Sequence, residues 1–497
     1  MSFSDRGDYR KGDDSFEEIP FQRMASEPNP HCCMKRLGQC MHKEFYSCAA
    51  REMLFTEKHR ANTFDLGTLT SQPQTVLNAA LHKALPDETA NLVGAIANCT
   101  NTIIGAGALA IPKTMGMTGI GVYHALVTAI FMVTLISLRW LIAVTDRLPH
   151  DVARNYEGVA NYFLGVEWSL AISAAFFFGG LSLTMAYIIL ITSSVAPILA
   201  GLGFGPVHLM EHLVRYTIGL GVCWPLAMMR DISGLRFTST LAIIALGYTV
   251  LFVTATSFQN YLEAGQHSSV QLVSSSVEFF SALAMSISAY SCHISVMPIY
   301  DSLGPGRNQR TMFKIVVISL LLSLAFYEVI GFAGYLQFGD AVDGNVLQTI
   351  ATHSGPNIWV TVATLSIAIT LAFSVPIIVW PLRSSILSTV QILQGRTGED
   401  ATPAEWQITT TAVMIVVLAI ATVFPDVKTA LSIGGSVGGA FIVFIYPAAF
   451  YLTVVKGVPA PRWSFVDHWP QLSMMVAGVL VGVLCLSFTV KNAVQSH

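Results

Sequence analysis

The sequence predicts an all-α polytopic membrane protein with eleven transmembrane helices. Of its 497 residues, 53% are hydrophobic and only 11% are charged, whereas about 25% of the residues in an ordinary soluble domain are charged. Charge-poor windows recur after residue 88, each long enough to cross a bilayer as a helix, which needs roughly 17–25 residues. Two of these windows, five spans apart, are interrupted by small and polar residues, which favours an internal repeat.

The chain divides into three parts. Residues 1–88 are polar, mixed in charge and without a long apolar core, which excludes a secretory signal peptide and predicts a disordered cytoplasmic tail. Residues 89–491 form the expected eleven-helix domain, and 492–497 a short extracellular C-terminus. We expect the spans at 90–112, 117–144, 168–198, 213–229, 237–258, 277–299, 315–337, 358–381, 408–424, 428–454 and 471–490.

The distribution of Lys and Arg predicts the orientation. Cytoplasmic loops of membrane proteins carry an excess of these residues. With the N-terminal tail inside, the basic residues gather on the inner side, while the long outer loops 259–276 and 338–357 contain none. The net charge of −3 gives no reason to expect a nucleic-acid partner, and the bilayer is the expected surrounding.

The first span contains "NCTNTIIGAGALAIP" at residues 98–112. Gly105 and Gly107 weaken a helix, and Pro112 removes a backbone hydrogen bond. Irregular backbone survives at membrane depth only inside protein or beside a water-filled cavity. Freed N–H groups attract a carboxylate and freed carbonyls attract a cation, so this segment suits the backbone of an amino acid. The alternative is close helix packing through small residues.

The sixth span repeats this feature in "ALAMSISAYSCHISVMPIYD", residues 282–301. A five-plus-five inverted repeat explains the spacing between the two interruptions, and such breaks mark the central site of transporters. Tyr290 and Ser291 lie in the interruption. His293 is either a proton relay or a neutral histidine that hydrogen-bonds between helices.

Two later spans hold candidates for ion coupling. Glu328 lies in the seventh span, where a carboxyl group carries a proton or pairs with a Ser, Tyr or Arg of a neighbouring helix. Thr370 and Ser374 share one face of the eighth span. Their hydroxyls either ligate a hard cation such as Na⁺ or hydrogen-bond back to their own helix.

No bound cofactor or metal is expected. "HLMEH", residues 208–212, fits the H-x-x-E-H zinc pattern, but it stands at a membrane mouth without a soluble catalytic domain around it. The tail segment 31–48 mixes Cys and His at a spacing unlike that of zinc sites. We therefore expect no catalytic residues and no enzyme activity.

Several segments together resemble the amino acid/auxin permease family of the amino acid–polyamine–organocation superfamily. They are "NTIIGAGALAIPKTMG", "SCHISVMPIY", "GYLQFGD", "SVPIIVWPLRSSI" and "SIGGSVGGAFIVFIYPAAFYL", in this order over about residues 89–490. The long polar tail and the layout are most similar to the amino acid permeases of trypanosomatid protozoa.

The resemblance implies a LeuT-like fold of five plus five inverted helices with one extra helix. It implies that the substrate's α-amino and α-carboxyl groups bind the backbone of the first span, at Thr102, Ile103, Ile104, Gly105, Ala106 and Gly107, opposite Tyr290 and Ser291. Sodium-coupled members have an Asn at the position of Asn101 and a hydroxyl at that of Ser374, and both are present here. Proton-coupled members exist as well.

We therefore predict a secondary active amino acid transporter that works by alternating access. The coupling ion is H⁺ or Na⁺, with H⁺ favoured, and the substrate is a basic or neutral amino acid. The competing hypothesis is an amino-acid sensor that signals through regulatory partners of its N-terminal tail. We expect the plasma membrane as its location, with the lysosomal or vacuolar membrane as the alternative.

Overall fold

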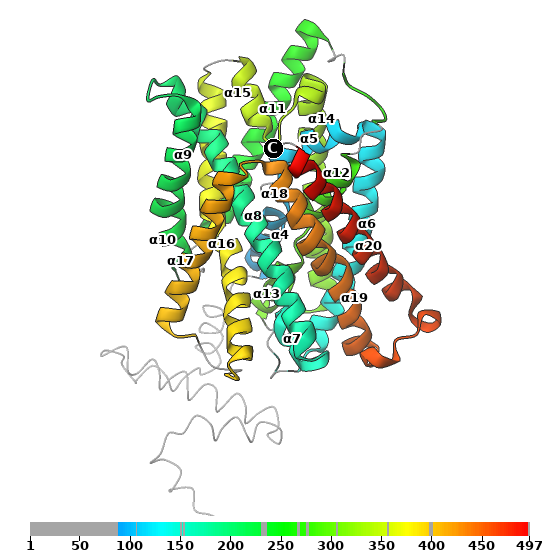
Figure 1. Cartoon of the computed structure of the whole chain (residues 1–497). Coiled ribbons are helices and arrows are strands. Elements are labelled where there is room, and N and C mark those ends of the chain that lie inside the picture. The colour runs from blue at the N-terminus through cyan, green and yellow to red at the C-terminus, as the bar shows by residue number, and fades with distance from the viewer. Residues whose placement is uncertain are drawn as a thin grey trace, which may run out of the picture. The chain divides into compact units, whose positions relative to one another are not determined.

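The computed structural model describes residues 88–105, 107–149, 152, 155–229, 236–265, 269–274, 278–304, 307–354, 357–396 and 401–495. The predictions for the tail up to residue 87, its Cys and His cluster included, lie outside this part of the chain. Within the described ranges every regular element is a helix (Figure 1). This agrees with the all-α class expected from the hydropathy pattern.

The helices follow one another as a series of long, mostly apolar segments. In chain order they are α4 (Glu88–Ile104), α5 (Gly107–Thr118), α6 (Ile120–Arg147), α7 (Tyr156–Phe163), α8 (Val166–Gly201), α9 (Val207–Ile218), η3 (Gly219–Cys223), α10 (Trp224–Ala227), α11 (Arg236–Ala264), α12 (Phe279–Ala289), α13 (His293–Ser302), α14 (Gln309–Phe338), η6 (Gly339–Ala341), α15 (Val346–Ser354), α16 (Ile358–Leu393), α17 (Pro403–Val423), α18 (Val427–Ile433), η7 (Gly434–Ile445), α19 (Tyr446–Phe450), η8 (Tyr451–Val455), η9 (Ala460–Arg462) and α20 (Phe465–Gln495).

Nine helices of the described ranges are long and apolar enough to cross a membrane, and the bent pair α4–α5 makes a tenth. The window predicted at 213–229 coincides with the end of α9, η3 and α10, which are individually too short to meet that criterion. A polytopic helical membrane protein is thus confirmed, and the count of eleven spans stays a prediction.

The two interruptions predicted from the sequence are both present. The axes of α4 and α5 differ by 45° across a break that contains Gly105, whose φ of +32° few residues other than glycine adopt. α12 ends before Tyr290, and α13 begins at His293. Pro112 lies inside α5 and does not itself interrupt the helix.

Glycines allow the π-helical segment η7 to approach two neighbouring helices. A Cβ placed on Gly438 would lie 2.8 Å from the Cα of Gly179 in α8. A Cβ on Gly435 would collide with the backbone carbonyl of Ala284 in α12. These close approaches pack the segment after α18 against both α8 and the helix before the second break.

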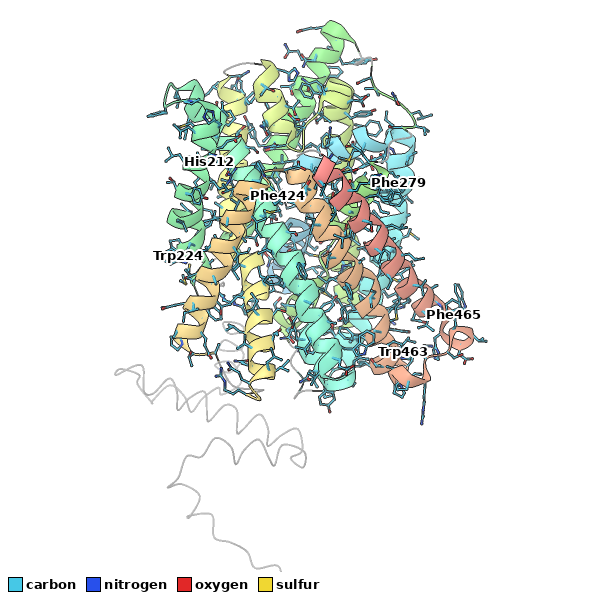
Figure 2. The ribbon with its side chains drawn as sticks, in the orientation of Figure 1. His212, Trp224, Phe279, Phe424, Trp463 and Phe465 are labelled. Carbon is cyan, nitrogen blue, oxygen red and sulfur yellow. The ribbon has the colours of Figure 1, made fainter. Side chains whose placement is uncertain are left out.

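The outer face of α20 is apolar, as expected for a helix that contacts lipid. Val476, Val479, Leu480 and Val483 are all more than half exposed. Figure 2 shows Trp463 and Phe465 at the start of this helix, at the end of the bundle that also carries α7. We call this the α7 end, and the opposite one, which carries α15, the α15 end.

The contacts of η7 predict unequal effects of two Gly→Ala substitutions. Gly435→Ala should lower the free energy of unfolding by about 1–3 kcal/mol, because the new methyl group overpacks against Ala284. Gly247→Ala, in α11, has no neighbour within 4 Å and should be neutral or stabilising by up to about 1 kcal/mol. Thermal unfolding in detergent micelles measures both, and equal melting temperatures would contradict the packing.

Candidate functional site

Neighbouring helices surround the first break closely. Gly105 N–H donates to the carbonyl of Asn101 at 3.1 Å and ends the helical hydrogen bonding of α4. A Cβ on Gly105 would collide with the Tyr187 hydroxyl of α8, and one on Gly107 would lie 2.9 Å from the Cβ of Ala289. Ala106, the predicted contact between them, lies outside the described residues.

The hydroxyl of Tyr327 in α14 joins the two breaks. It lies 2.6 Å from the carbonyl oxygen of Ile103, 3.3 Å from that of Ile104 and 2.9 Å from that of Ala289. A phenol has one proton to donate, so the Tyr327 hydroxyl can form a hydrogen bond with only one of these three carbonyls at a time. Tyr327 was not predicted from the sequence, because an uncharged aromatic residue does not interrupt a hydropathy window.

Tyr290 presents an unpaired hydroxyl at the second break. Its side chain is fully buried, and its hydroxyl has no hydrogen-bond partner among the described residues. Its ring meets that of Tyr327 edge-on, with centroids 5.2 Å apart. Buried polar groups are normally satisfied, so this hydroxyl suits a polar ligand or water. The adjacent Ser291 is half-buried.

The substrate contacts predicted in α4 are of two kinds: backbone carbonyls, and one hydroxyl that already donates to its own helix. Ile103 and Ile104 are buried, and their carbonyls face Tyr327. The Thr102 hydroxyl donates to the carbonyl of Asn98 at 2.8 Å, within its own helix. Asn101 is half-buried in the last turn of α4. The polar groups that the structure brings together here are backbone carbonyls and tyrosine hydroxyls.

His293 is buried at the start of α13, with its Nε2 2.7 Å from the Ser137 hydroxyl of α6. This is the interhelical hydrogen bond that one of the two sequence hypotheses describes. Thr370 donates to the carbonyl of Ser366 and Ser374 to that of Thr370, each at 2.9 Å. Their oxygen lone pairs remain able to accept a cation, so sodium binding by these hydroxyls stays a hypothesis.

Glu328 pairs with a residue that the sequence analysis did not consider. Its Oε2 lies 2.8 Å from Nε2 of His124 in α6. The other imidazole nitrogen lies 2.6 Å from the carbonyl oxygen of Ile120 and must carry a proton to donate to it. One further proton is therefore shared between imidazole and carboxyl. The partner is a histidine rather than the expected Ser, Tyr or Arg.

Two other polar groups lie away from the breaks. Glu278, at the start of α12, forms an ion pair with Lys428 at 2.9 Å. His208 and His212 of the zinc-like motif are exposed on α9, and Figure 2 shows His212 at the periphery of the bundle. Among the described residues no group of three His, Cys, Asp or Glu side chains could hold a metal ion.

Comparison with known proteins places the chain in a family. Residues 88–494 match the family model described as "Transmembrane amino acid transporter protein". The chain belongs to this family. The amino acid/auxin permease resemblance is thereby confirmed, as is the expectation of a transporter rather than an enzyme.

Individual relatives of the transporter have low sequence identity to it. It is 24% identical over 416 residues to "Vacuolar amino acid transporter 5" of Schizosaccharomyces pombe, a match that covers 81% of this chain and 95% of the relative. It is 24% identical over 399 residues to "Solute carrier family 38 member 10" of Rattus norvegicus. That match covers 78% of this chain but only 35% of the longer rat protein.

The position of Tyr327 predicts that its hydroxyl is needed for transport. Tyr327→Phe leaves the carbonyls at both breaks without this donor, and should lower the free energy of unfolding by about 1–3 kcal/mol and reduce amino acid uptake. Tyr248→Phe is the matched control, because its hydroxyl bonds only to an exposed carbonyl of Trp359. Uptake into proteoliposomes measures the effect, and a Tyr327→Phe variant as active as the control would refute it.

We expect Glu157, in the short helix α7, to make the stability of the folded transporter depend on pH. Burial raises the pKa of this carboxyl group, while a hydrogen bond from Ser385 opposes the shift. The folded transporter thus holds this proton to higher pH than the unfolded chain. The resulting stabilisation is complete below the unfolded pKa and is lost as pH rises through the raised value.

Glu157→Gln should therefore melt higher than the unmodified transporter at pH 8, by on the order of 1 °C, and the difference should vanish at pH 4. Glu167→Gln, which replaces an exposed carboxyl group in α8, is the control. Melting curves across this range test the prediction. A difference that is constant with pH would show that folding does not raise the pKa of this carboxyl group.

Proposed function

We propose that the transporter is a proton-coupled symporter of neutral amino acids that works by alternating access. The substrate's main-chain groups bind at the two helix breaks, and a proton binds at the Glu328–His124 pair. The observation that carries this proposal is the combination of two opposed breaks with a proton-sharing pair on the neighbouring helices α6 and α14.

The breaks provide both kinds of group that a zwitterion needs. α4 and α12 end there with free carbonyls, the negative ends of their helix dipoles, while α5 and α13 begin there with free N–H groups. A substrate ammonium group fits the first and a carboxylate the second. The proposed contacts are the backbone of residues 102–107 together with Tyr290 and Ser291.

The proton site is supported by the 2.8 Å contact between the Glu328 carboxyl group and the His124 imidazole. The Glu328–His124 pair can hold one proton between its two side chains, either as imidazolium and carboxylate or as imidazole and carboxylic acid. Both forms have no net charge. Losing that proton leaves an unneutralised carboxylate inside the bilayer, which is costly. Occupancy of this site by a proton can therefore bias one transporter conformation against another. Na⁺ at Asn101, Thr370 and Ser374 is the alternative.

The acidic residues support a neutral substrate. The sequence left basic and neutral amino acids open as substrates. Glu278 is paired with Lys428 and Glu328 with His124. A cationic side chain of the substrate would have to displace one of these partners, whereas a neutral side chain would not.

The proposal places the transporter in the plasma membrane, with an acidic organelle as the alternative. The yeast relative is named as vacuolar, and proton coupling operates in either membrane. Imaging of the tagged full chain beside markers of both membranes distinguishes them.

The test of coupling is uptake into proteoliposomes under an imposed pH gradient, with and without Na⁺. Glu328→Gln and His124→Asn should reduce gradient-driven uptake to the level without a gradient, because neither leaves a carboxyl–imidazole pair to exchange the proton. Glu263→Gln, an exposed carboxyl group on α11, should retain it. Uptake that requires Na⁺ and is reduced by Asn101→Ala or Ser374→Ala would overturn proton coupling and favour the sodium site.

A further inference from the structure

Two buried tyrosine hydroxyls near the Glu328–His124 pair lack hydrogen-bond partners. Tyr123, in α6, and Tyr290, at the second break, are fully buried. Neither hydroxyl has a hydrogen-bond partner among the described residues. A buried hydroxyl without a partner costs free energy, and native structures keep few of them. These two hydroxyls therefore need an explanation that packing does not give.

The hydroxyl of Tyr123 reaches α14 beside the proton site. A Cβ placed on Gly331 would lie 3.9 Å from this hydroxyl. Gly331 follows Glu328 by three residues and Tyr327 by four, so it lies one helical turn from both. Tyr123 also interacts electrostatically with Glu328. Because Glu328 and its partner His124 are partly exposed, the buried Tyr123 lies on the inner side of the pair.

Tyr290 extends this connection to the second break. Its ring meets that of Tyr327 edge-on, with centroids 5.2 Å apart. It interacts electrostatically with both Tyr123 and Glu328. Tyr290 is also one of the proposed substrate contacts. Glu328, Tyr123 and Tyr290 therefore lead from the proton site to the substrate site, and we call these three residues the coupling series.

The carboxyl group of Glu328 has acceptor capacity for these hydroxyls. Its Oε2 lies 2.8 Å from Nε2 of His124, but it has no aligned hydrogen bond among the described residues. An ionised carboxylate only accepts hydrogen bonds, whereas a protonated one also donates. A phenol has a single proton to donate. The direction in which the tyrosine hydroxyls donate therefore depends on whether the pair holds its proton.

We propose that Tyr123 is a positioning residue that transmits the protonation state of Glu328, through Tyr290, to the carboxylate of the bound substrate. Without the shared proton, the two hydroxyls donate toward the Glu328 carboxylate, directly or through water. With the proton bound, the Tyr290 hydroxyl is released to donate to the substrate. The inference rests on the proposed function and deepens it, because it assigns the link between proton and substrate.

The other titratable groups around the coupling series do not compete for its charge. Tyr327 lies within hydrogen-bonding distance of backbone carbonyls of the breaks. Tyr187 and Cys292 interact electrostatically with Tyr327. Phenols and thiols are ordinarily uncharged near neutral pH. The charge that changes beside the series is therefore that of the Glu328–His124 pair.

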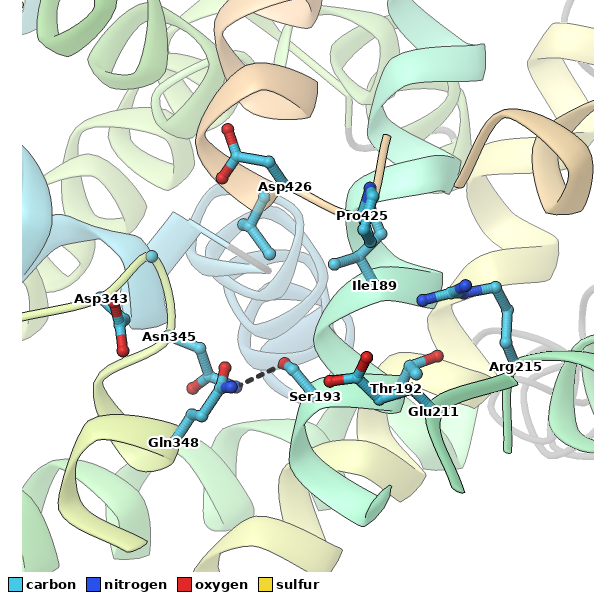
Figure 3. A pocket seen from close by; sticks show the side chains of 12 residues that line it. Ile189, Thr192, Ser193, Glu211, Arg215, Asp343, Asn345, Gln348, Pro425 and Asp426 are labelled. Carbon is cyan, nitrogen blue, oxygen red and sulfur yellow. Dashed lines mark hydrogen bonds between the residues drawn. The ribbon is translucent and has the colours of Figure 1, made fainter. Parts of the chain in front are cut away.

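A cavity of about 320 Å³ at the α15 end lies apart from the coupling series (Figure 3). Its lining residues come from α8, α9, α15, α18 and the adjoining loops, and none of them belongs to α6 or α14. Within it, Arg215 interacts electrostatically with Glu211. The cavity therefore contributes no group to the link between the proton and the substrate.

The experiment is uptake of a mixture of radiolabelled neutral L-amino acids by proteoliposomes that contain the full chain. The half-saturating concentration is measured at acidic and at neutral external pH. In the unmodified transporter it should be lower at acidic pH by about fivefold or more, because proton and substrate favour each other's binding. Tyr123→Phe should lose this difference, as should Glu328→Gln.

Tyr156→Phe is the matched control. Tyr156 is also a buried tyrosine, but its hydroxyl donates to the carbonyl of Ile442 at 3.3 Å. This variant should retain the pH difference and melt at a lower temperature, since it leaves that carbonyl unpaired. Tyr123→Phe removes a hydroxyl without a protein partner and should not melt lower. If its uptake is too low to measure, equilibrium binding of the same mixture in detergent micelles gives the comparison.

The outcomes separate this inference from the proposed function. A pH difference that is retained in Tyr123→Phe and lost in Glu328→Gln overturns the role of Tyr123 and leaves the proton site intact. A difference that is lost in Tyr123→Phe and retained in Glu328→Gln overturns both. A half-saturating concentration that is independent of pH in the unmodified transporter overturns the inference. In that case the proposed function stands only if a pH gradient still drives uptake.

Discussion

The need to satisfy backbone polar groups at membrane depth is the constraint on which this structure depends. Two helices are broken at membrane depth, where lipid cannot form hydrogen bonds with the backbone. Each break leaves carbonyls and N–H groups without helical partners. The Tyr327 hydroxyl lies between carbonyls of both breaks and links α4 to α12 through α14. Because it has only one proton for three acceptors, the breaks retain acceptor capacity for a ligand.

The surrounding scaffold holds these breaks at short distances. The glycines of η7 allow it to approach α8 and α12 without side chains between them, and Gly107 allows α5 to approach Ala289. Larger residues would separate the half-helices. The small residues of "GAGALA" thus allow close packing, and the same backbone remains the proposed binding segment.

Two acidic residues of the described helices are paired with basic residues. Glu328 with His124 and Glu278 with Lys428 each combine an acid with a base. Pairing lowers the cost of placing these groups in a low-dielectric surrounding. Arg215 is buried as well, and it lines a cavity together with Glu211.

The sequence by itself determined the helical membrane class, the family and the location of both helix breaks. Hydropathy is a local property, and Gly105 or the run from Tyr290 to Cys292 weakens a helix wherever it packs. Only the tertiary structure showed that Tyr327 bridges the breaks, that His124 is the partner of Glu328, and that Arg215 lines a cavity with Asp343. These partners are far apart in the sequence, and no local pattern encodes such contacts. The roles of Asn101, Thr370 and Ser374 depend on the coupling ion, which neither hydropathy nor packing specifies.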